Sequence, residues 1–263
     1  MERTPPRLSI DVFGTVVGIG FEGKDASRLA GETRRAWSRC LPPANAEPDK
    51  QIDVHVEPGS AVVRIEEEIY APDAETALEL LTQSVTIAGL TRAAGRLLML
   101  HACGLSDPTT GRTAVLVGPS GMGKSTACQL HGRRWAYVTD ECVALDQDGV
   151  LTRYPKPLSL DRGASVKAQV GPDDLGLAHA PERLEPAAVL LLDRREGAAL
   201  TSREVPLTEA VARLAEHTSY LAALPEPLQR LAGLVRRAGC TEVTYGSTQE
   251  LAAVLGAVLG EEA

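Results

Sequence analysis

The hydrophobic pattern of the first 95 residues predicts strands and turns followed by a helix. Residues 8–19 are rich in β-forming side chains, and apolar positions alternate with polar ones in QIDVHV, residues 51–56. Turn residues at 59–60 separate this strand from a second apolar stretch at 61–71, which predicts a hairpin. From Pro72, apolar residues recur at helical spacing. The pattern therefore indicates a small α+β segment over residues 1–95.

The remaining residues, 96–263, alternate strands with helices, which is typical of an α/β domain. RLLMLHACGL and RTAVLVG flank the turn SDPTTG, so two paired strands are expected there. Further along, the pattern predicts strands at 135–145 and 187–195, helices at 124–132, 207–217 and 225–238, and a closing strand and helix within 242–260. The strand at 135–145 is expected to carry charge at its end.

A glycine-rich loop between the second of these strands and a helix carries the clearest motif. GPSGMGKST fits the Walker A pattern Gly-x-x-x-x-Gly-Lys-Ser, in which backbone amides cradle phosphates, the lysine reaches the β and γ phosphates, and the serine hydroxyl holds Mg²⁺. The helix N-terminus adds positive potential. The predicted nucleotide-binding residues are Gly118, Pro119, Ser120, Gly121, Met122, Gly123, Lys124, Ser125 and Thr126.

A phosphate loop needs a carboxylate opposite it, for a metal ion or for the attacking group. Two apolar runs end in aspartate: WAYVTDE, with Asp140 and Glu141, and AAVLLLDR, with Asp193. We favour Asp140, because one helix and one short loop return its strand beside the loop strand, and adjacent parallel strands bring their ends together. The predicted metal ligands are Ser125, Asp140 and Glu141. A solvated strand end is the alternative for the acidic pair.

His101 lies in the strand that is expected to pair with the loop strand, which makes it a third candidate. An ordinary histidine with a backbone partner is the equally weighted alternative. The other histidines have no such context and are assigned to structure: His55, His131, His179 and His217.

Composition narrows the function classes. The net charge is −8, which argues against a nucleic-acid partner. MERTPPRLSI lacks the apolar segment of a signal peptide, and no run approaches ~18 apolar residues, so we expect no membrane span and a cytoplasmic protein. Five scattered cysteines without C-x-x-C spacing suggest neither a zinc site nor a disulfide framework.

The run HACGLSDPTTGRTAVLVGPSGMGKSTACQL, followed by WAYVTDE, resembles the catalytic domain of HPr kinase/phosphorylase over residues 97–145. The resemblance implies a P-loop nucleotide-binding domain of the HPr kinase and phosphoenolpyruvate carboxykinase type. It further implies ATP and Mg²⁺ as cofactors and transfer of the γ-phosphate to a hydroxyl, commonly of a serine. In the family, the general base maps onto Asp140, the second acid onto Glu141, and a histidine near the transferred phosphate onto His101. Lys124 completes the catalytic set.

The chain departs from that family at several points. The Glu-Val-Arg-Gly stretch has only a weak echo in SLDRGA, and Glu141 stands where the family more often has Asp. YPKPLSL is similar to a stretch of divergent members that accompany peptide-modifying genes, which favours a kinase acting on a peptide, a protein or a small molecule. Lys156 and Arg162 are weaker candidates to steady the γ-phosphate, and solvated loop charges are the preferred interpretation.

Other function classes stay in view. A transporter ATPase lacks support because no Leu-Ser-Gly-Gly signature occurs, and guanylate kinase carries its loop at the N-terminus of a shorter chain. A nucleotide-binding regulatory protein without chemistry would need neither Asp140 nor His101. Residues 1–95 are expected to serve recognition or oligomerisation, so assembly into a homo-oligomer also stays open.

Overall fold

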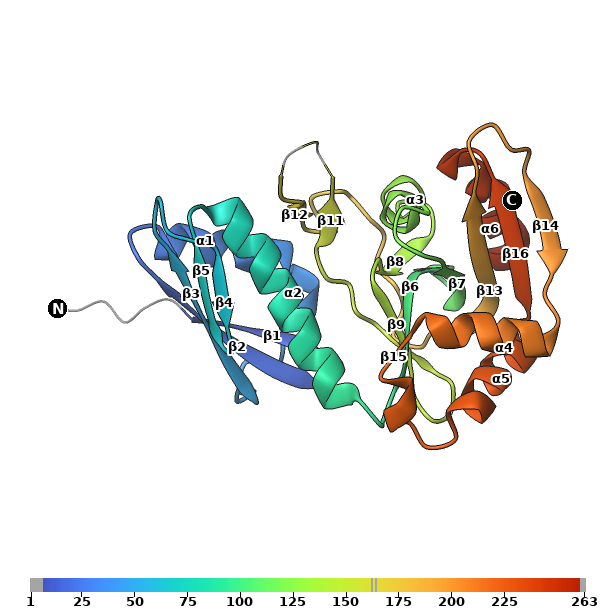
Figure 1. The fold of residues 1–263 in the computed structure, drawn as a ribbon, viewed down its shortest axis with the longest axis horizontal. Helices are drawn as coiled ribbons and strands as arrows, with labels where there is room; N and C mark the ends of the chain where they lie inside the picture. Colours follow the sequence, from blue (N-terminus) through green and yellow to red (C-terminus); the bar gives the residue numbers. More distant parts are fainter. Residues whose placement is uncertain (1–6, 162, 164, 261–263) are drawn as a thin grey trace. The chain divides into compact units, whose positions relative to one another are not determined.

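The computed structural model describes residues 7–161, 163 and 165–260, and it confirms a mixed α/β architecture. The chain forms two compact units (Figure 1). The first contains the residues up to Ala93 together with Pro155–Leu175, and the second contains Ala94–Tyr154 and the residues from Gly176. The change of unit at Ala93 lies close to the expected boundary near residue 95. The segment 155–175, by contrast, belongs to the first unit although the sequence placed it within 96–263.

A five-stranded sheet forms the centre of the first unit, in the order β1-β2-β3-β5-β4. Its strands are β1 (Arg7–Val12), β2 (Thr15–Glu22), β3 (Lys50–Val56), β4 (Val63–Ile65) and β5 (Glu68–Ala71). The hairpin expected between residues 51–56 and 61–71 is wrong. β3 pairs in parallel with β5, and the hairpin forms between β4 and β5, where Glu66 takes a left-handed φ of 51°. Along the chain, β4 therefore comes first and forms the edge of the sheet, and β5 follows and lies between β3 and β4.

Helix α2 (Ala74–Ala93) covers this sheet and confirms the helical spacing seen from Pro72. It buries Ala77, Leu81, Val85 and Ala88. Gly89 lies so close to β1 that a Cβ atom there would stand 2.2 Å from Val12 Cγ1. Because no space is left for a side chain at this contact, α2 requires a glycine here.

The segment 155–175 adds a hairpin to the first unit, formed by β11 (Leu158–Leu160) and β12 (Ala168–Val170). Ion pairs connect this segment to helix α1 (Ala26–Ala36) and to the short 3-10 helix η1 (Ser38–Cys40). Arg35 pairs with Asp174 at 2.6 Å, and Arg39 pairs with Asp173 at 2.7 Å. These contacts explain why a segment distant in sequence belongs to this unit.

The second unit is built on a large sheet in the order β10-β9-β6-β7-β13-β16-β14, with β8 and β15 also paired to β6. Its strands are β6 (Leu98–Ser106), β7 (Arg112–Val117), β8 (Ala136–Thr139), β9 (Cys142–Leu145), β10 (Leu151–Thr152), β13 (Glu185–Arg194), β14 (Thr201–Glu204), β15 (Thr218–Ser219) and β16 (Cys240–Tyr245). The expected antiparallel pair β6–β7 is confirmed. β7, β13 and β16 run parallel to one another.

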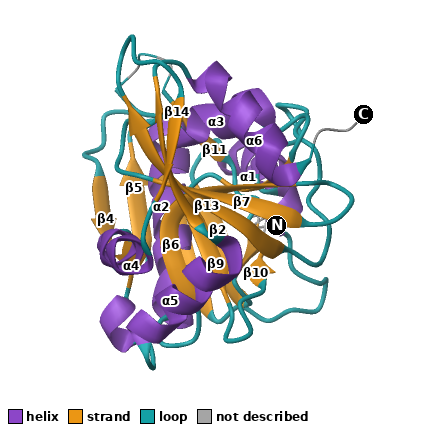
Figure 2. Ribbon diagram, turned by 90° about the vertical axis from the view of Figure 1, so that its right-hand side faces the viewer, coloured by secondary structure: helices purple, strands orange, loops and turns teal. Residues whose placement is uncertain are grey.

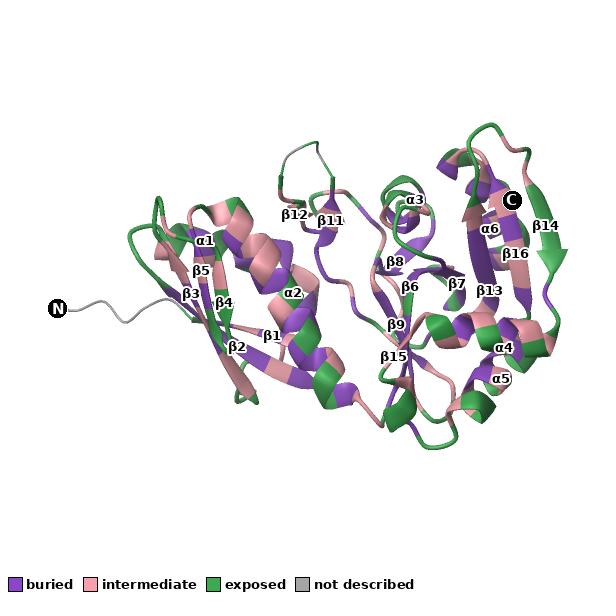
Figure 3. Ribbon diagram, viewed as in Figure 1, coloured by how far each residue is buried: buried purple, intermediate pink, exposed green. Residues whose placement is uncertain are grey.

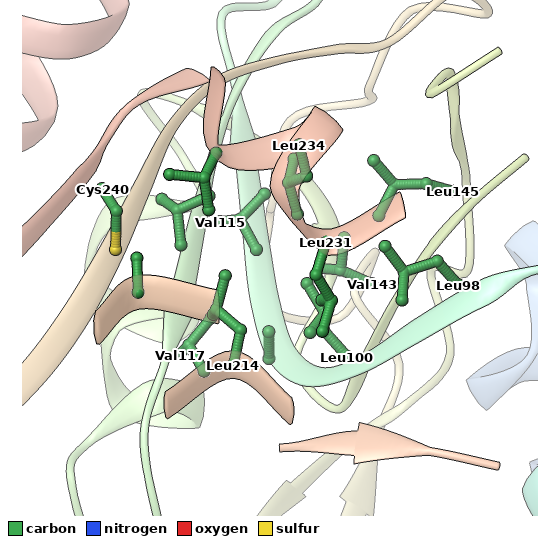
Figure 4. Close-up of a cluster of buried hydrophobic side chains, with 14 of the residues drawn as sticks. Leu98, Leu100, Val115, Val117, Val143, Leu145, Leu214, Leu231, Leu234 and Cys240 are labelled. Atoms are coloured by element: carbon green, nitrogen blue, oxygen red, sulfur yellow. The ribbon is translucent and has the colours of Figure 1, made fainter. Parts of the chain in front are cut away.

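Helices cover both faces of this sheet (Figure 2). α3 (Lys124–His131) and α6 (Leu251–Leu259) pack on one face, and α4 (Leu207–Glu216) and α5 (Pro227–Ala238) on the other. The α4–α5 face holds a buried apolar cluster that includes Leu100, Val117, Leu214 and Leu231 (Figure 4). Because side chains alternate along a strand, His101 and Cys103 of β6 face the opposite side, toward α3.

The stretch 135–145 differs from the single strand that was expected. It is split into β8 and β9, with Asp140 and Glu141 between them rather than at the end. Both pieces pair with β6, and a register irregularity at Gly104–Leu105 accompanies the break. None of the helices in the described ranges has the length and apolar content to span a bilayer.

Candidate functional site

The glycine-rich loop leaves the sheet at the end of β7 and leads directly into α3. Gly121 and Gly123 have φ values of 88° and 83°, which side chains rarely adopt. A Cβ atom on Gly123 would also lie 2.9 Å from Thr248 Oγ1, whereas one on Gly121 would meet nothing within 4 Å. The backbone at 121 thus borders open space. Gly123 is the N-cap of α3 and supplies no side-chain cap, so the first amides of the helix have no partner within it.

Lys124 folds back onto its own loop. Its Nζ donates hydrogen bonds to the carbonyl oxygens of Gly118 at 2.5 Å and Pro119 at 3.1 Å, and the residue is only 7% exposed. Burial lowers the pKa of Lys124, and the nearby Cys103 and Asp140 act in the opposite direction. The ammonium is therefore a dehydrated charge, held by two carbonyls that an anion could replace.

Residues from the C-terminal part of the chain contact the loop and the end of α3, and no local sequence pattern predicts these contacts. The Tyr245 hydroxyl donates a hydrogen bond to the carbonyl oxygen of Met122. The Arg194 amide contacts Met122 Sδ at 3.4 Å, and His131 Nε2 lies 2.9 Å from the Thr248 carbonyl oxygen. Burial raises the pKa of Tyr245 to about 12, so its hydroxyl stays a proton donor at physiological pH.

Strand β6 lies between the loop and the acidic pair. Ala102 pairs with Val117, the last residue of β7, along one edge of β6. On the other edge, the Ala102 amide donates to the carbonyl oxygen of Glu141 at 3.1 Å. Neighbouring strands lie about 4.8 Å apart, so the loop base and the acidic pair are separated by two strand spacings, roughly 10 Å along the backbone.

The structure corrects the reasoning that favoured Asp140. Its strand, β8, is not the parallel neighbour of β7, because the antiparallel β6 lies between them. The parallel neighbour is β13, which carries Asp193. Asp140 nevertheless lies near the loop, since its charge raises the pKa of Lys124. It is 4% exposed and accepts a hydrogen bond from the Tyr137 hydroxyl at 3.1 Å. Glu141 is half-buried.

Asp193 is engaged elsewhere. Its carboxylate accepts hydrogen bonds from Arg195 Nε and from Thr244 Oγ1, each at 3.1 Å. The Arg195 hydrogen bond is the main reason why the pKa of Asp193 lies below its usual range. Asp193 is not among the groups that perturb Lys124. The carboxylate at the end of β13 is therefore held by Arg195 and Thr244, and Asp140 is the carboxylate whose charge acts on Lys124.

His101 belongs to the same group of charges. It keeps exposed surface, yet desolvation by its neighbours lowers its pKa, and the charge of Lys124 lowers it further. Glu141 and Asp140 act on His101 in the opposite sense. The charges of Lys124, Asp140 and Glu141, the three other residues that the sequence proposed as catalytic, thus all act on the pKa of His101.

A fifth residue, His217, joins this group although the sequence assigned it to structure. β7 and β15 pair with the same edge of β6. The pairing with β7 ends at Ala102, and β15 pairs further along this edge with Met99 and Leu100. The His101 amide donates to the His217 carbonyl oxygen at 2.7 Å. Burial lowers the pKa of His217, and the Lys124 charge lowers it further. The glycine-rich loop therefore leaves the sheet next to His217. Only the strand pairing reveals this, because 92 residues separate His217 from Ser125 in the sequence.

The remaining predicted residues fall into two groups. Pro119, Ser120, Gly121 and Thr126 are exposed on the loop and the first turn of α3, and Ser125 is half-buried there. Lys156, a weaker candidate, belongs to the first unit, where its buried Nζ donates to the Pro157 carbonyl oxygen at 2.8 Å. Lys156 is therefore a buried cation rather than the solvated loop charge that was preferred. Arg162 lies outside the described residues.

Comparisons with known proteins give likenesses to solved structures alone. No model of a protein family matches the chain, and no curated protein matches it. Among solved structures, the HPr(Ser) kinase/phosphatase from Coxiella burnetii is similar, with a TM-score of 0.32 and 12% sequence identity. The alignment covers 59% of this chain and 90% of that one. A likeness at this level does not establish a shared activity, so the functional argument below uses the residues of the site.

Proposed function

We propose that the second unit is a Mg-ATP-dependent kinase that transfers the γ-phosphate to a hydroxyl group of a peptide, a protein or a small molecule. The observation that carries this proposal is the loop of Walker A sequence between β7 and α3, which holds the Lys124 ammonium buried on the carbonyls of Gly118 and Pro119. The motif resemblance of residues 97–145 to HPr kinase/phosphorylase supports the same assignment. The proposed fold is accordingly a P-loop nucleotide-binding domain of the HPr kinase type.

Nucleotide binding is assigned to the loop and to the start of α3. The backbone at Gly121 borders open space, and the first amides of α3 have no partner within the helix. Lys124 Nζ would exchange the carbonyls of Gly118 and Pro119 for phosphate oxygens. Because this ammonium is already dehydrated, its attraction to a phosphate is stronger than in open water.

The residues present fit a magnesium ion. Mg²⁺ in nucleotide sites takes few protein ligands, since it keeps waters and binds phosphates. Within the described ranges no cluster of three or more His, Cys, Asp or Glu side chains is placed to hold a metal. Ser125, Asp140 and Glu141 supply the oxygen atoms that Mg²⁺ prefers, and they would hold the ion together with the substrate phosphates. When bound, Mg²⁺ neutralises charge on the phosphates.

Asp140 is the proposed general base. Its carboxylate accepts a hydrogen bond from the Tyr137 hydroxyl, which helps to orient it, and in this role it would take the proton of an acceptor hydroxyl. A positioned base contributes ~10²–10⁴-fold to a rate. Alignment of the acceptor and neutralisation of phosphate charge supply most of the rest. Lowered pKa values keep His101 and His217 neutral at pH 7, so each imidazole can donate one N–H to the transferred group.

The test separates binding from transfer. Purified protein is incubated with γ-labelled ATP and a cell extract, and nucleotide affinity is measured by calorimetry. Lys124→Ala should weaken ATP binding. Asp140→Asn should retain binding and lose labelling of the acceptor. Asp193→Asn is the matched control and should retain both.

Three results would contradict the proposal. Acceptor labelling by Asp140→Asn at the wild-type rate would remove the base assignment. Unchanged ATP binding by Lys124→Ala would remove the loop assignment. Nucleotide binding without labelling of any extract component would instead identify a regulatory protein that binds nucleotide and transfers nothing.

A further inference from the structure

The first unit contains a cavity of about 290 Å³ between α2 and the α2-facing side of its sheet. Its apolar lining comes from Ile52 on β3 and from Ile87 and Ala88 on α2. Ile87 is 47% exposed, so the cavity opens to the surface. All the lining residues belong to this unit, which makes the cavity separate from the residues assigned to phosphoryl transfer.

The polar lining of this cavity is predominantly cationic. Lys50, Arg64 and Arg92 contribute three positive charges against one carboxylate, Glu66. Arg92 pairs with Asp49 at 3.3 Å, and Lys50 has only a distant partner in Glu67, at 3.9 Å. In the described part of the chain Arg64 makes no ion pair. The cavity therefore has an uncompensated cation at its mouth, although the whole chain is acidic.

A second observation is an unsatisfied hydroxyl in the same cavity. Ser84 on α2 lines the cavity, and its Oγ is buried without a hydrogen-bond partner. A buried polar atom without a partner is destabilising, and a ligand atom that accepts its proton would remove that penalty. A carboxylate can accept a hydrogen bond from a hydroxyl and from a guanidinium, and Arg64 lines the same cavity.

The edge strand β4 adjoins the cavity and is open along one side. It is the last strand of its sheet among the described residues and is drawn largely in the colour of exposed residues in Figure 3. Val62 and Ile65 are 56% and 61% exposed. In the β4–β5 register Arg64 lies directly opposite the buried Ile69, so the two side chains lie on the same face of the sheet, the face that packs against α2. Exposed apolar edges are sites where another chain can add a strand.

We propose that this surface binds an extended acidic peptide segment. The peptide adds as a strand to β4, a carboxylate side chain enters the cavity toward Arg64 and Ser84, and an apolar side chain on the other face of the strand packs against Ile65. The charge of the lining selects the acidic occupant, and the alternation of side chains along a strand selects an alternating acidic and apolar sequence. This inference does not rest on the proposed kinase reaction.

The experiment uses the full chain and a fluorescein-labelled peptide of alternating glutamate and valine. Fluorescence anisotropy should show saturable binding that weakens as salt increases. The same peptide with glutamine in place of glutamate should bind at least tenfold more weakly. Arg64→Glu should weaken binding of the glutamate peptide by about tenfold or more, because it removes a charged hydrogen bond and adds a repulsive charge. Arg34→Glu, an exposed change on α1, is the matched control and should leave binding unchanged.

N-methylation of the peptide tests strand addition. Methyl groups on one alternate set of amides should abolish binding, whereas the other set, which points away from β4, should be tolerated. Equal binding of the glutamine peptide, or an Arg64→Glu protein that folds with the wild-type melting temperature and binds normally, would overturn the proposal. Sedimentation that shows β4-dependent dimers with no peptide binding would overturn it in favour of self-association.

Discussion

The main-chain amide of His101 donates a hydrogen bond to the carbonyl oxygen of His217, across a distance of 2.7 Å. The pairing of β7 with β6 ends at Ala102, and this bond lies next to it on the same edge of β6. It therefore places His217 where the glycine-rich loop leaves the sheet. Lys124 perturbs the pKa of both imidazoles. His217 is therefore a residue of the candidate site that no local motif announces.

His217→Ala should lower the rate of acceptor phosphorylation by about 10-fold or more, as expected when a donor to a developing charge is lost. ATP affinity should change little, because Lys124 and the loop amides remain. Radiolabel transfer and calorimetry measure the two quantities. His179→Ala, an exposed histidine of the same unit, should be neutral in both. A His217→Ala protein with the wild-type transfer rate would exclude His217 from the reaction.

The two histidines should also impose a pH dependence on stability. Both have folded-state pKa values below 6.5, so from about 6.5 downward the unfolded chain binds protons that the folded chain does not. The free energy of unfolding should therefore decrease as the pH falls through this window. Urea unfolding at a series of pH values measures the slope. The double variant His101→Gln, His217→Gln should flatten the slope between about pH 6.5 and pH 5, and an unchanged slope would contradict the assigned shifts.

Tyr245→Phe removes the hydroxyl that donates to the Met122 carbonyl. Loss of one buried hydrogen bond should reduce the free energy of unfolding by about 1 kcal/mol, and ATP affinity should fall because the loop is less well held. Chemical denaturation and calorimetry give the two values. Tyr220→Phe, at an exposed position, controls for loss of a hydroxyl. Wild-type ATP affinity in Tyr245→Phe would show that this contact does not position the loop.

Two glycines in helices of the first unit should respond oppositely to alanine. Gly89→Ala forces a Cβ atom to within 2.2 Å of Val12 Cγ1 and should destabilise the unit by roughly 1–3 kcal/mol. Gly31→Ala, on the exposed face of α1 with nothing within 4 Å, should stabilise it by about 0.4–1 kcal/mol. Thermal unfolding measures both changes. Destabilisation of similar size in the two variants would contradict the packing assigned to α2.

The sequence predicted the elements of the second unit well where the signal was local. The β6–β7 hairpin, the buried strand β13 and the helices α3, α4 and α5 all follow from periodicity and turn residues. Even the N-terminal turn of the last helix is foreseen, since Ser247 and Glu250 form a capping pair in which Glu250 accepts from the Ser247 amide at 2.7 Å.

Strand pairing was the part that the sequence could not supply. QIDVHV and the stretch containing EIYA have the alternation of a hairpin, but the register Asp53–Glu68 shows that they run parallel. Local alternation specifies which face of a strand is buried and carries no information about its partner. The same limit hid His217 and made β8 appear adjacent to β7.

Each unit draws on a discontinuous stretch of chain, because residues 155–175 leave the second unit and return to it. The polypeptide consequently passes from one unit to the other three times. Removing residues 1–93 would cut only the first of these connections. The β11–β12 hairpin would remain in the chain without α1 and α2, the helices of its own unit. Producing the second unit by itself therefore calls for an artificial link from Tyr154 to Gly176, and recombination between related chains would exchange these units intact only if it kept all three crossings.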